Sequence, residues 1–403
     1  MTPLAGHEKT AIKANFETFT EQTGIEVVVK SQRSDEETWR LASDPDDADI
    51  LEIPQPGAIR ELASGKVMDL TRYLDRDELE MTQSPYLTSL VSLGDDGSWP
   101  STSGPVYGLW SKLDAKSLVW FNIAAFDRLG QGVPETWDEL VTISDQIVAN
   151  DDTPWCIYVE SGAASGWPAT DIIESALLRS EGPEFYDEWS FHEIDFDHPA
   201  VVAAVRRVGE LVFTPEYLDR SPAAAAQTAF FDGPITLAQE PPGCMFVPMA
   251  SFAPSMTGSG AGEVIDAFDF PTIDPRYSET MVGGGTYVVA VTDRPEVRAA
   301  MEFIASPDYG HASVEAGIGY IPANTRFDLD AIPNATERRI AELTHAALLS
   351  DGFRFDASDL MPVEVGAGTF WAGMVDWFDD GPEALDDIMA DIEAGWPDDE
   401  PAG

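Results

Sequence analysis

Basic residues are scarce in this sequence of 403 residues. Lysine and arginine together number 23, against 72 aspartates and glutamates, which gives a formal net charge of −49 at pH 7. Proteins that bind nucleic acids need clusters of Lys and Arg, because these neutralise phosphates and release counterions. A chain so poor in positive charge repels phosphate groups. We therefore exclude nucleic acid as a partner.

Long apolar runs are also missing. The longest stretch without a charge, residues 241–262, has 22 residues and is long enough to span a bilayer. Pro242, Pro248 and Pro254 interrupt it, and a lipid-exposed helix does not tolerate so many breaks. The first residues lack the charged and apolar regions of a secretory leader. The sequence as given predicts neither a membrane span nor a signal peptide.

Metal-binding patterns are absent as well. The two cysteines, Cys156 and Cys244, lack the paired spacing of a zinc site, and the five histidines are scattered. The acidic cluster at residues 44–49 lacks the glycine and the final glutamate of a calcium loop. We expect no metal and no other cofactor, while the two cysteines can form one disulfide if the protein is exported.

Signatures of catalysis are missing too. The sequence contains no GxSxG, HExxH, Walker or GxGxxG motif. With 72 acidic residues, some pair of carboxylates always lies at the spacing that glycoside hydrolysis needs, so their abundance carries no information. We expect a protein that is not an enzyme. A secreted glycoside hydrolase that uses a carboxylate pair stays open as the alternative.

The acidic excess predicts a stability that depends on salt, as in haloarchaeal proteins that stay soluble at molar salt. The Debye length is about 3 Å at 1 M salt and about 30 Å at 0.01 M, so dilution lets the surface carboxylates repel one another. We expect the melting temperature to fall as NaCl is lowered from about 3 M to 0.1 M. A melting temperature that is the same across this range would contradict the expectation.

Apolar runs of strand length alternate with helical patterns along the chain, which predicts an α/β fold. Strands are expected at residues 26–29, 50–53, 117–121, 156–159, 245–247 and 287–291. Helices are expected at residues 8–23, 36–41, 57–65, 136–149, 168–180, 199–212, 295–304, 336–348 and 382–394.

Stretches without charge are informative in so acidic a chain. Besides residues 241–262, they are residues 97–111, 161–170, 280–292 and 365–375, and all combine small residues with aromatic ones. Apart from residues 287–291, they are poor core strands, and we interpret them as loops that meet a neutral ligand. A sugar fits best, because its C–H faces stack on aromatic rings and its hydroxyls need polar partners.

Specific strings then point to a family. YGLWSKLDAKSLVWFNIAAFDRLGQGVPETWDELVTISDQI (107–147) resembles the family 1 extracellular solute-binding proteins of ABC sugar importers. TPWCIYVESGAASGWPATDIIESALLRSEGPEFYDEW (153–189) resembles the α-glucoside-binding branch of that family, and CMFVPMASF (244–252) resembles its second cysteine motif. GTFWAGMVDW (368–377) resembles its ligand-facing tryptophan helix.

This resemblance implies a two-lobed, periplasmic-binding-protein-like (type II) α/β fold with a ligand cleft between the lobes and hinge crossings. We expect residues 1–115 plus 271–321 in the first lobe, whose opening strand would precede this chain, and residues 116–270 plus 322–403 in the second. The implied protein is a monomeric, extracellular, surface-anchored receptor that passes an α-glucoside or related oligosaccharide to ABC permease subunits. A sugar sensor without a transport role is a further alternative.

The resemblance also implies the functional residues. Those expected to bind the ligand are His7, Glu8, Arg33, Ser34, Gln55, Gly57, Lys112, Asp114, Glu160, Ser161, Trp167, Asp171, Ser251, Phe252, Gly284, Gly285, Thr286 and Trp371. It places Cys156 and Cys244 together on the second lobe, and we expect them to be bonded. No residue is expected to be catalytic or to bind a metal.

Overall fold

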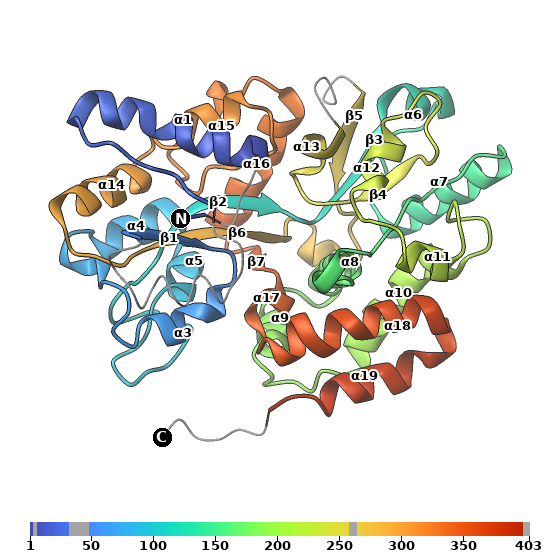
Figure 1. Ribbon diagram of the computed structural model, residues 1–403. Coiled ribbons are helices and arrows are strands. Elements are labelled where there is room, and N and C mark those ends of the chain that lie inside the picture. Colours follow the sequence, from blue (N-terminus) through green and yellow to red (C-terminus); the bar gives the residue numbers. More distant parts are fainter. Residues whose placement is uncertain (3–5, 32–47, 258–263, 398–403) are drawn as a thin grey trace. The chain divides into compact units, whose positions relative to one another are not determined.

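The computed structural model describes residues 1–2, 6–31, 48–257 and 264–397 (Figure 1). The chain forms two compact units. Unit 1 comprises Met1–Asp114 and Gly284–Asp351, and unit 2 comprises Ala115–Gly283 and Gly352–Gly403. The chain therefore passes from one unit to the other three times, as the two-lobed expectation requires.

The unit boundaries differ from two of the expected ones. Residues 271–283 belong to unit 2, because Met281–Gly283 at the start of strand β6 pair in parallel with β7 (Phe353–Phe355). Residues 322–351 belong to unit 1, where His345 of helix α16 (Ala335–Leu349) is bonded through Nε2 to the carbonyl oxygen of Pro322 at 2.8 Å. The strand pairing decided the first boundary, and the packing of α16 decided the second.

Unit 1 is built on a sheet with the strand order β1–β6–β2. Strand β1 (Ile50–Ile53) runs antiparallel to β6 (Met281–Ala290), with Ile50 opposite Ala290, and β2 spans Leu109–Ala115. The other helices of this unit are α1 (Gly6–Thr23), α3 (Ile59–Leu62), α4 (Arg76–Gln83), α5 (Pro85–Leu90), α14 (Pro295–Ala305) and α15 (His311–Glu315).

Aromatic rings form part of the core of unit 1. Phe16 and Phe19 of α1 meet Phe303 of α14, and the rings of Phe19 and Phe303 stack with their centroids 5.3 Å apart. Tyr309 closes the cluster 5.5 Å from Phe16. Rings in such arrangements add about 0.5–1.5 kcal/mol per pair to the burial of their area. The side of α1 that carries Phe16 and Phe19 therefore faces the core of unit 1.

Unit 2 contains a sheet with the strand order β4–β3–β5, both pairings being antiparallel. Its strands are β3 (Leu118–Asn122), β4 (Phe246–Pro248) and β5 (Ile265–Asp269). Its helices are α6 (Ile123–Leu129), α7 (Trp137–Ala149), α8 (Trp167–Glu181), α9 (Pro183–Ser190), α10 (Pro199–Phe213), α11 (Pro222–Ala226), α12 (Asp232–Leu237), α13 (Ala253–Thr257), α17 (Ala357–Leu360), α18 (Trp371–Asp380) and α19 (Leu385–Glu393).

Helix α8 is the central helix of unit 2, buried along almost its whole length and packed against α9, α10, α17 and α18 (Figure 1). Helix α7 shows how the local sequence fixes an end. The Thr136 side chain accepts a hydrogen bond from the Glu139 backbone N–H, and Glu139 bonds back to the Thr136 backbone, which is a capping box. The predicted start of this helix at residue 136 is thereby confirmed to within one residue.

Several predicted elements differ in the structure. Residues 26–29 form no strand, because the described part of the chain offers them no ladder partner: the nearest pairing is the single bridge Thr2↔Ser31. Residues 156–159 form none either, because their main chain changes partner from Phe246 to Ala225 within four residues. The helix predicted at 57–65 shortens to a 3₁₀ turn and α3, and the one predicted at 36–41 lies outside the described residues.

Two uncharged runs that were interpreted as loops are regular structure instead. Residues 281–290 are strand β6, buried over nearly all its length, because its neighbours on both sides remove it from water. Residues 364–370 are a π-helix that leads directly into α18. The small residues in these two runs allow close packing. An absence of charge is common to packed elements and to loops, so it does not distinguish them.

The predicted disulfide is present. Cys156 and Cys244 are bonded, with their Cα atoms 5.8 Å apart, and both side chains are buried in unit 2. Among the described residues, none of the helices has the length and hydropathy needed to cross a membrane.

Candidate functional site

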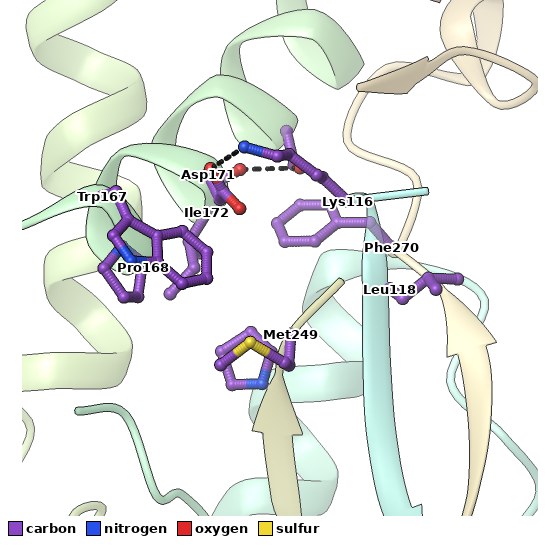
Figure 2. Close-up of a pocket in the computed structure, with 10 residues that line it drawn as sticks. Lys116, Leu118, Trp167, Pro168, Asp171, Ile172, Met249 and Phe270 are labelled. Carbon is purple, nitrogen blue, oxygen red and sulfur yellow. Dashed lines mark hydrogen bonds and ion pairs between the residues drawn. The ribbon is translucent and has the colours of Figure 1, made fainter. Parts of the chain in front are cut away.

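Lys116 lies within a cluster of charged side chains in unit 2. It is the second residue after the chain first passes from unit 1 to unit 2. Its Nζ lies 3.0 Å from Asp171 Oδ1 on α8 and forms a second ion pair with Asp356, which follows β7 (Figure 2 shows the pair with Asp171). Burial alone would lower the pKa of Lys116, but Asp171 and Asp356 raise it well above its usual value. Lys116 is therefore a permanent cation that holds two segments together.

Two further carboxyl groups crowd this cation. Glu174, one turn along α8, accepts hydrogen bonds from the backbone N–H groups of Ala357 and Ser358 at 2.9 and 3.2 Å. Burial and the neighbouring Asp356 and Asp171 raise its pKa well above the usual range. Burial, followed by the Asp356 charge, raises the pKa of Asp359 to about 7. Glu174 and Asp359 therefore bind a proton more readily than exposed carboxyl groups do.

This cluster predicts a pH dependence of stability. Because the pKa of Asp359 rises to about 7 on folding, its stabilising contribution is full below the unfolded value near 4 and is lost as the pH rises through 7. At constant high salt, we expect Asp359→Asn to gain free energy of unfolding relative to the wild type, by up to about 1.4 kcal/mol per pH unit between pH 5 and 7. Urea melts at several pH values measure this difference.

Asp376→Asn, on the exposed side of α18, is the control. If the curves of unfolding free energy against pH were parallel for the wild type and both variants, the expectation would be contradicted.

Aromatic rings border the cluster at the start of α8. Trp167 meets Phe230 edge-on with centroids 5.0 Å apart and Phe252 at 6.3 Å, and Lys116 Nζ lies 5.6 Å from the indole centroid. Trp167 and Asp171 also line a small pocket of about 10 Å³ with Met249 (Figure 2). That is room for about one water molecule.

Trp371 is half-buried at the point where the π-helix Glu364–Phe370 becomes α18. π-helical turns occur frequently at functional sites. Its backbone packs so closely on Gly166 that a Cβ on that glycine would lie 2.0 Å from the Trp371 carbonyl oxygen. The indole Nε1–H donates to Ser358 Oγ at 3.0 Å. The backbone of Trp371 and one edge of its indole ring are thus both held in place, while part of the residue stays open to solvent.

Unit 1 holds a second lysine with two carboxylates, among the predicted ligand residues. Lys112 of β2 is buried, and its Nζ lies 3.2 Å from Glu8 Oε1 and 3.1 Å from Asp114 Oδ1. Burial opposes the charge, yet Asp114 and Glu8 raise the pKa of Lys112 above its usual value. These three predicted residues come together in the structure. His7, beside Glu8, is exposed.

Other predicted residues of unit 1 take structural positions. Thr286 is buried and donates through Oγ1 to Glu52 Oε1 at 2.7 Å. Gly284 and Gly285 belong to β6, and a Cβ on Gly285 would lie 2.3 Å from the Lys112 carbonyl oxygen, so only glycine fits there. Gln55 and Gly57 are half-buried at the 3₁₀ turn after β1.

Arg33 and Ser34 lie outside the described part of the chain. The remaining predicted residues lie in unit 2. Glu160 and Ser161 are half-buried in the turn before α8, where Glu160 Oε1 accepts from the Gly162 N–H at 2.8 Å. Ser251 is buried and bonded in both directions to the backbone of Ala115, which gives it a structural role at the first crossing.

Sequence reasoning missed Lys116, Phe230, Asp356 and Ser358. The signal for Lys116 was the rarity of lysine, because two of the six lysines of the chain, Lys112 and Lys116, lie within residues 109–122. Asp356 and Ser358 carried no signal, since acidic residues and serines are common here. Within the described residues, no group of three His, Cys, Asp or Glu side chains is arranged to hold a metal ion.

Comparison with known proteins places the chain. A family described as bacterial extracellular solute-binding protein matches residues 5–310. The osmoprotective compounds-binding protein of Synechocystis is 33% identical over 98% of this chain and 91% of its own length. The alpha-glucosides-binding periplasmic protein of Rhizobium meliloti is 33% identical over 98% of this chain and 85% of its own length.

Solved structures share the fold. A bacterial solute receptor with a preference for β-D-galactopyranose matches 98% of this chain and 96% of its own with a TM-score of 0.77 and 14% identity. The maltose-bound T. maritima MalE3 matches 98% of this chain and 97% of its own with a TM-score of 0.71 and 18% identity. At these identities the likeness concerns the fold. Because the family match covers most of the chain and two relatives align over nearly all of it, this chain belongs to the bacterial extracellular solute-binding proteins.

Proposed function

We propose that this protein is the sugar-binding receptor of an ABC importer and captures an α-glucoside or a related oligosaccharide for delivery to permease subunits. The observation that carries this proposal is the identity of 33% with an alpha-glucosides-binding protein along 98% of the chain. The motif at residues 153–189, which resembles that branch, supports it. We further propose a monomer anchored at the outer cell surface of a halophilic organism.

The chemistry of unit 2 suits such a ligand. Trp167 and Trp371 are both half-buried, so each keeps some ring surface on which the C–H face of a sugar can stack. Asp171 lies beside Trp167, one turn along α8, and offers an acceptor for sugar hydroxyls. Rigid aromatic rings lose little entropy on binding, which favours affinity. We propose the same hydroxyl-binding role for Glu8, Lys112 and Asp114 of unit 1.

Hydrolysis is the competing function, and the bonding of these carboxylates disfavours it. Asp171 and Asp356 are both held by Lys116, and Glu174 is occupied by backbone N–H groups. A glycosidase needs one carboxyl group free to donate a proton and another free to attack or to activate water. The family consists of binding proteins, and we infer that this chain binds its sugar without changing it.

A thermal-shift screen tests the proposal. The protein is melted in about 3 M KCl with maltose, trehalose, sucrose, glucose or galactose, since ligand at a hundred times its dissociation constant adds about 2.7 kcal/mol of stability. We expect an α-linked glucoside to give the largest shift. Galactose giving the largest shift would overturn the α-glucoside assignment, and no shift with any sugar would overturn sugar binding. Release of p-nitrophenol from its α-glucoside would favour the hydrolase instead.

A further inference from the structure

A chain of contacts connects two of the side chains proposed to contact sugar in unit 2, Trp371 and Asp171. The Trp371 indole N–H donates to Ser358 Oγ at 3.0 Å, and the Ser358 hydroxyl donates to Asp356 Oδ1 at 2.6 Å. The other oxygen of Asp356 pairs with Lys116, which also pairs with Asp171. Trp371 and Asp171 are thus the two ends of one network.

Ser358 has a position suited to this role. It is 3% exposed, and its hydroxyl accepts from the indole while donating to a carboxylate that is itself buried. A hydroxyl donates one hydrogen bond, so its bond to Asp356 orients an oxygen lone pair toward the indole. Glu174 fixes the backbone of the same residue by accepting from the Ser358 N–H at 3.2 Å. Side chain and main chain are therefore both constrained.

We propose that Ser358 is a positioning residue for ligand binding, which sets the rotation of the Trp371 indole and, through Asp356 and Lys116, links it to the Asp171 carboxylate. This inference rests on the proposed function. An indole that can rotate must lose that freedom when a sugar stacks on it, whereas a fixed indole has lost it on folding. Ser358 therefore acts on affinity without touching the ligand.

The chain offers a matched control. Ser144 of α7 is also buried and accepts the indole N–H of Trp155 through Oγ at 3.1 Å, and Trp155 is fully buried in the core of unit 2. Ser144→Ala and Ser358→Ala each remove the acceptor of an indole N–H, one in the core and one at the proposed ligand face. Each also removes the bond that the hydroxyl donates, to the Leu140 carbonyl oxygen and to Asp356 respectively, and both variants are expected to lower stability.

Calorimetric titration with the α-glucoside that gives the largest thermal shift tests the inference. We expect Ser358→Ala to weaken binding about 3- to 10-fold, as for the loss of one hydrogen bond, and Ser144→Ala to leave it unchanged. In a Trp371→Phe background, which lacks the indole N–H, Ser358→Ala should cost no further affinity. The proposal would be overturned if Ser358→Ala bound the sugar as tightly as the wild type does. It would also be overturned if Ser358→Ala lowered the affinity as much in the Trp371→Phe background as in the wild type.

A measurement without ligand separates this inference from the proposed function. The protein is labelled with 5-fluorotryptophan, and the Trp371 and Trp155 signals are assigned by Trp371→Phe and Trp155→Phe. Asp356→Asn keeps the oxygen that caps α17 but removes the charge. We expect Asp356→Asn to shift or broaden the fluorine signal of Trp371 and not that of Trp155. An unchanged Trp371 signal would overturn the link between Asp356 and the indole, even if the wild type binds a sugar. If the signal changes but no sugar binds in the thermal-shift screen, only the proposed function is overturned.

Discussion

Replacing Trp371 by alanine is expected to weaken sugar binding by about 2 to 4 kcal/mol, as for an aromatic hot spot. The reason is that the indole is half-buried, is held at its edge by Ser358 and keeps part of its surface open. Truncation removes that stacking surface from the ligand. Stability should fall by less than affinity, because the ring is only partly covered by protein. Calorimetric titration and a urea melt of the same variant measure the two effects.

Trp377, in the same helix α18, provides the control. Its ring is 1% exposed and packs edge-on against Phe213 with centroids 5.0 Å apart, so it is a core residue. Trp377→Phe should therefore lower stability and leave the affinity of the folded protein unchanged. If Trp371 were also a core residue, Trp371→Ala would cost about 3 to 5 kcal/mol of stability and the affinity would stay near that of the wild type. That result would remove Trp371 from the proposed site.

Breaking the Cys156–Cys244 disulfide is expected to cost about 4 to 5 kcal/mol of folding free energy, because the bond closes a loop with a sequence separation of 88. This value follows from the chain-entropy account, in which the bond limits the freedom of the unfolded chain. Both half-cystines are buried, so their reduced or truncated forms stay in an apolar setting. A urea melt at constant high salt, with and without reductant, measures the difference.

The double variant Cys156→Ala with Cys244→Ala serves as the control. It should unfold at the same urea concentration as the reduced wild type, and added reductant should not change it further. A loss below about 1 kcal/mol on reduction would mean that the unfolded chain is not restrained by the bond as the entropy account assumes. Free thiols found in the unreduced, denatured protein would show that the bond had not formed.

Local signals in the sequence predicted the helices better than the isolated strands. The helix at residues 136–149 was predictable because Thr136 and Glu139 specify its start within four residues. The segment 156–159 has the composition of a strand, yet it forms none, since a strand also needs a partner that continues alongside it. Strand formation depends on distant residues, and neither propensity nor alternation encodes them.

The sequence by itself determined the charge of the molecule and the α/β class, because these depend on composition and on periods of a few residues. Motifs also pointed to the family and to the bonded cysteines. Only the tertiary structure decided that Lys116 would lie between Asp171 and Asp356, and that Ser358 would hold the indole of Trp371. Lys116 and Asp356, for example, are 240 positions apart in the sequence. Such contacts arise when packed elements bring side chains together, and no local pattern records them.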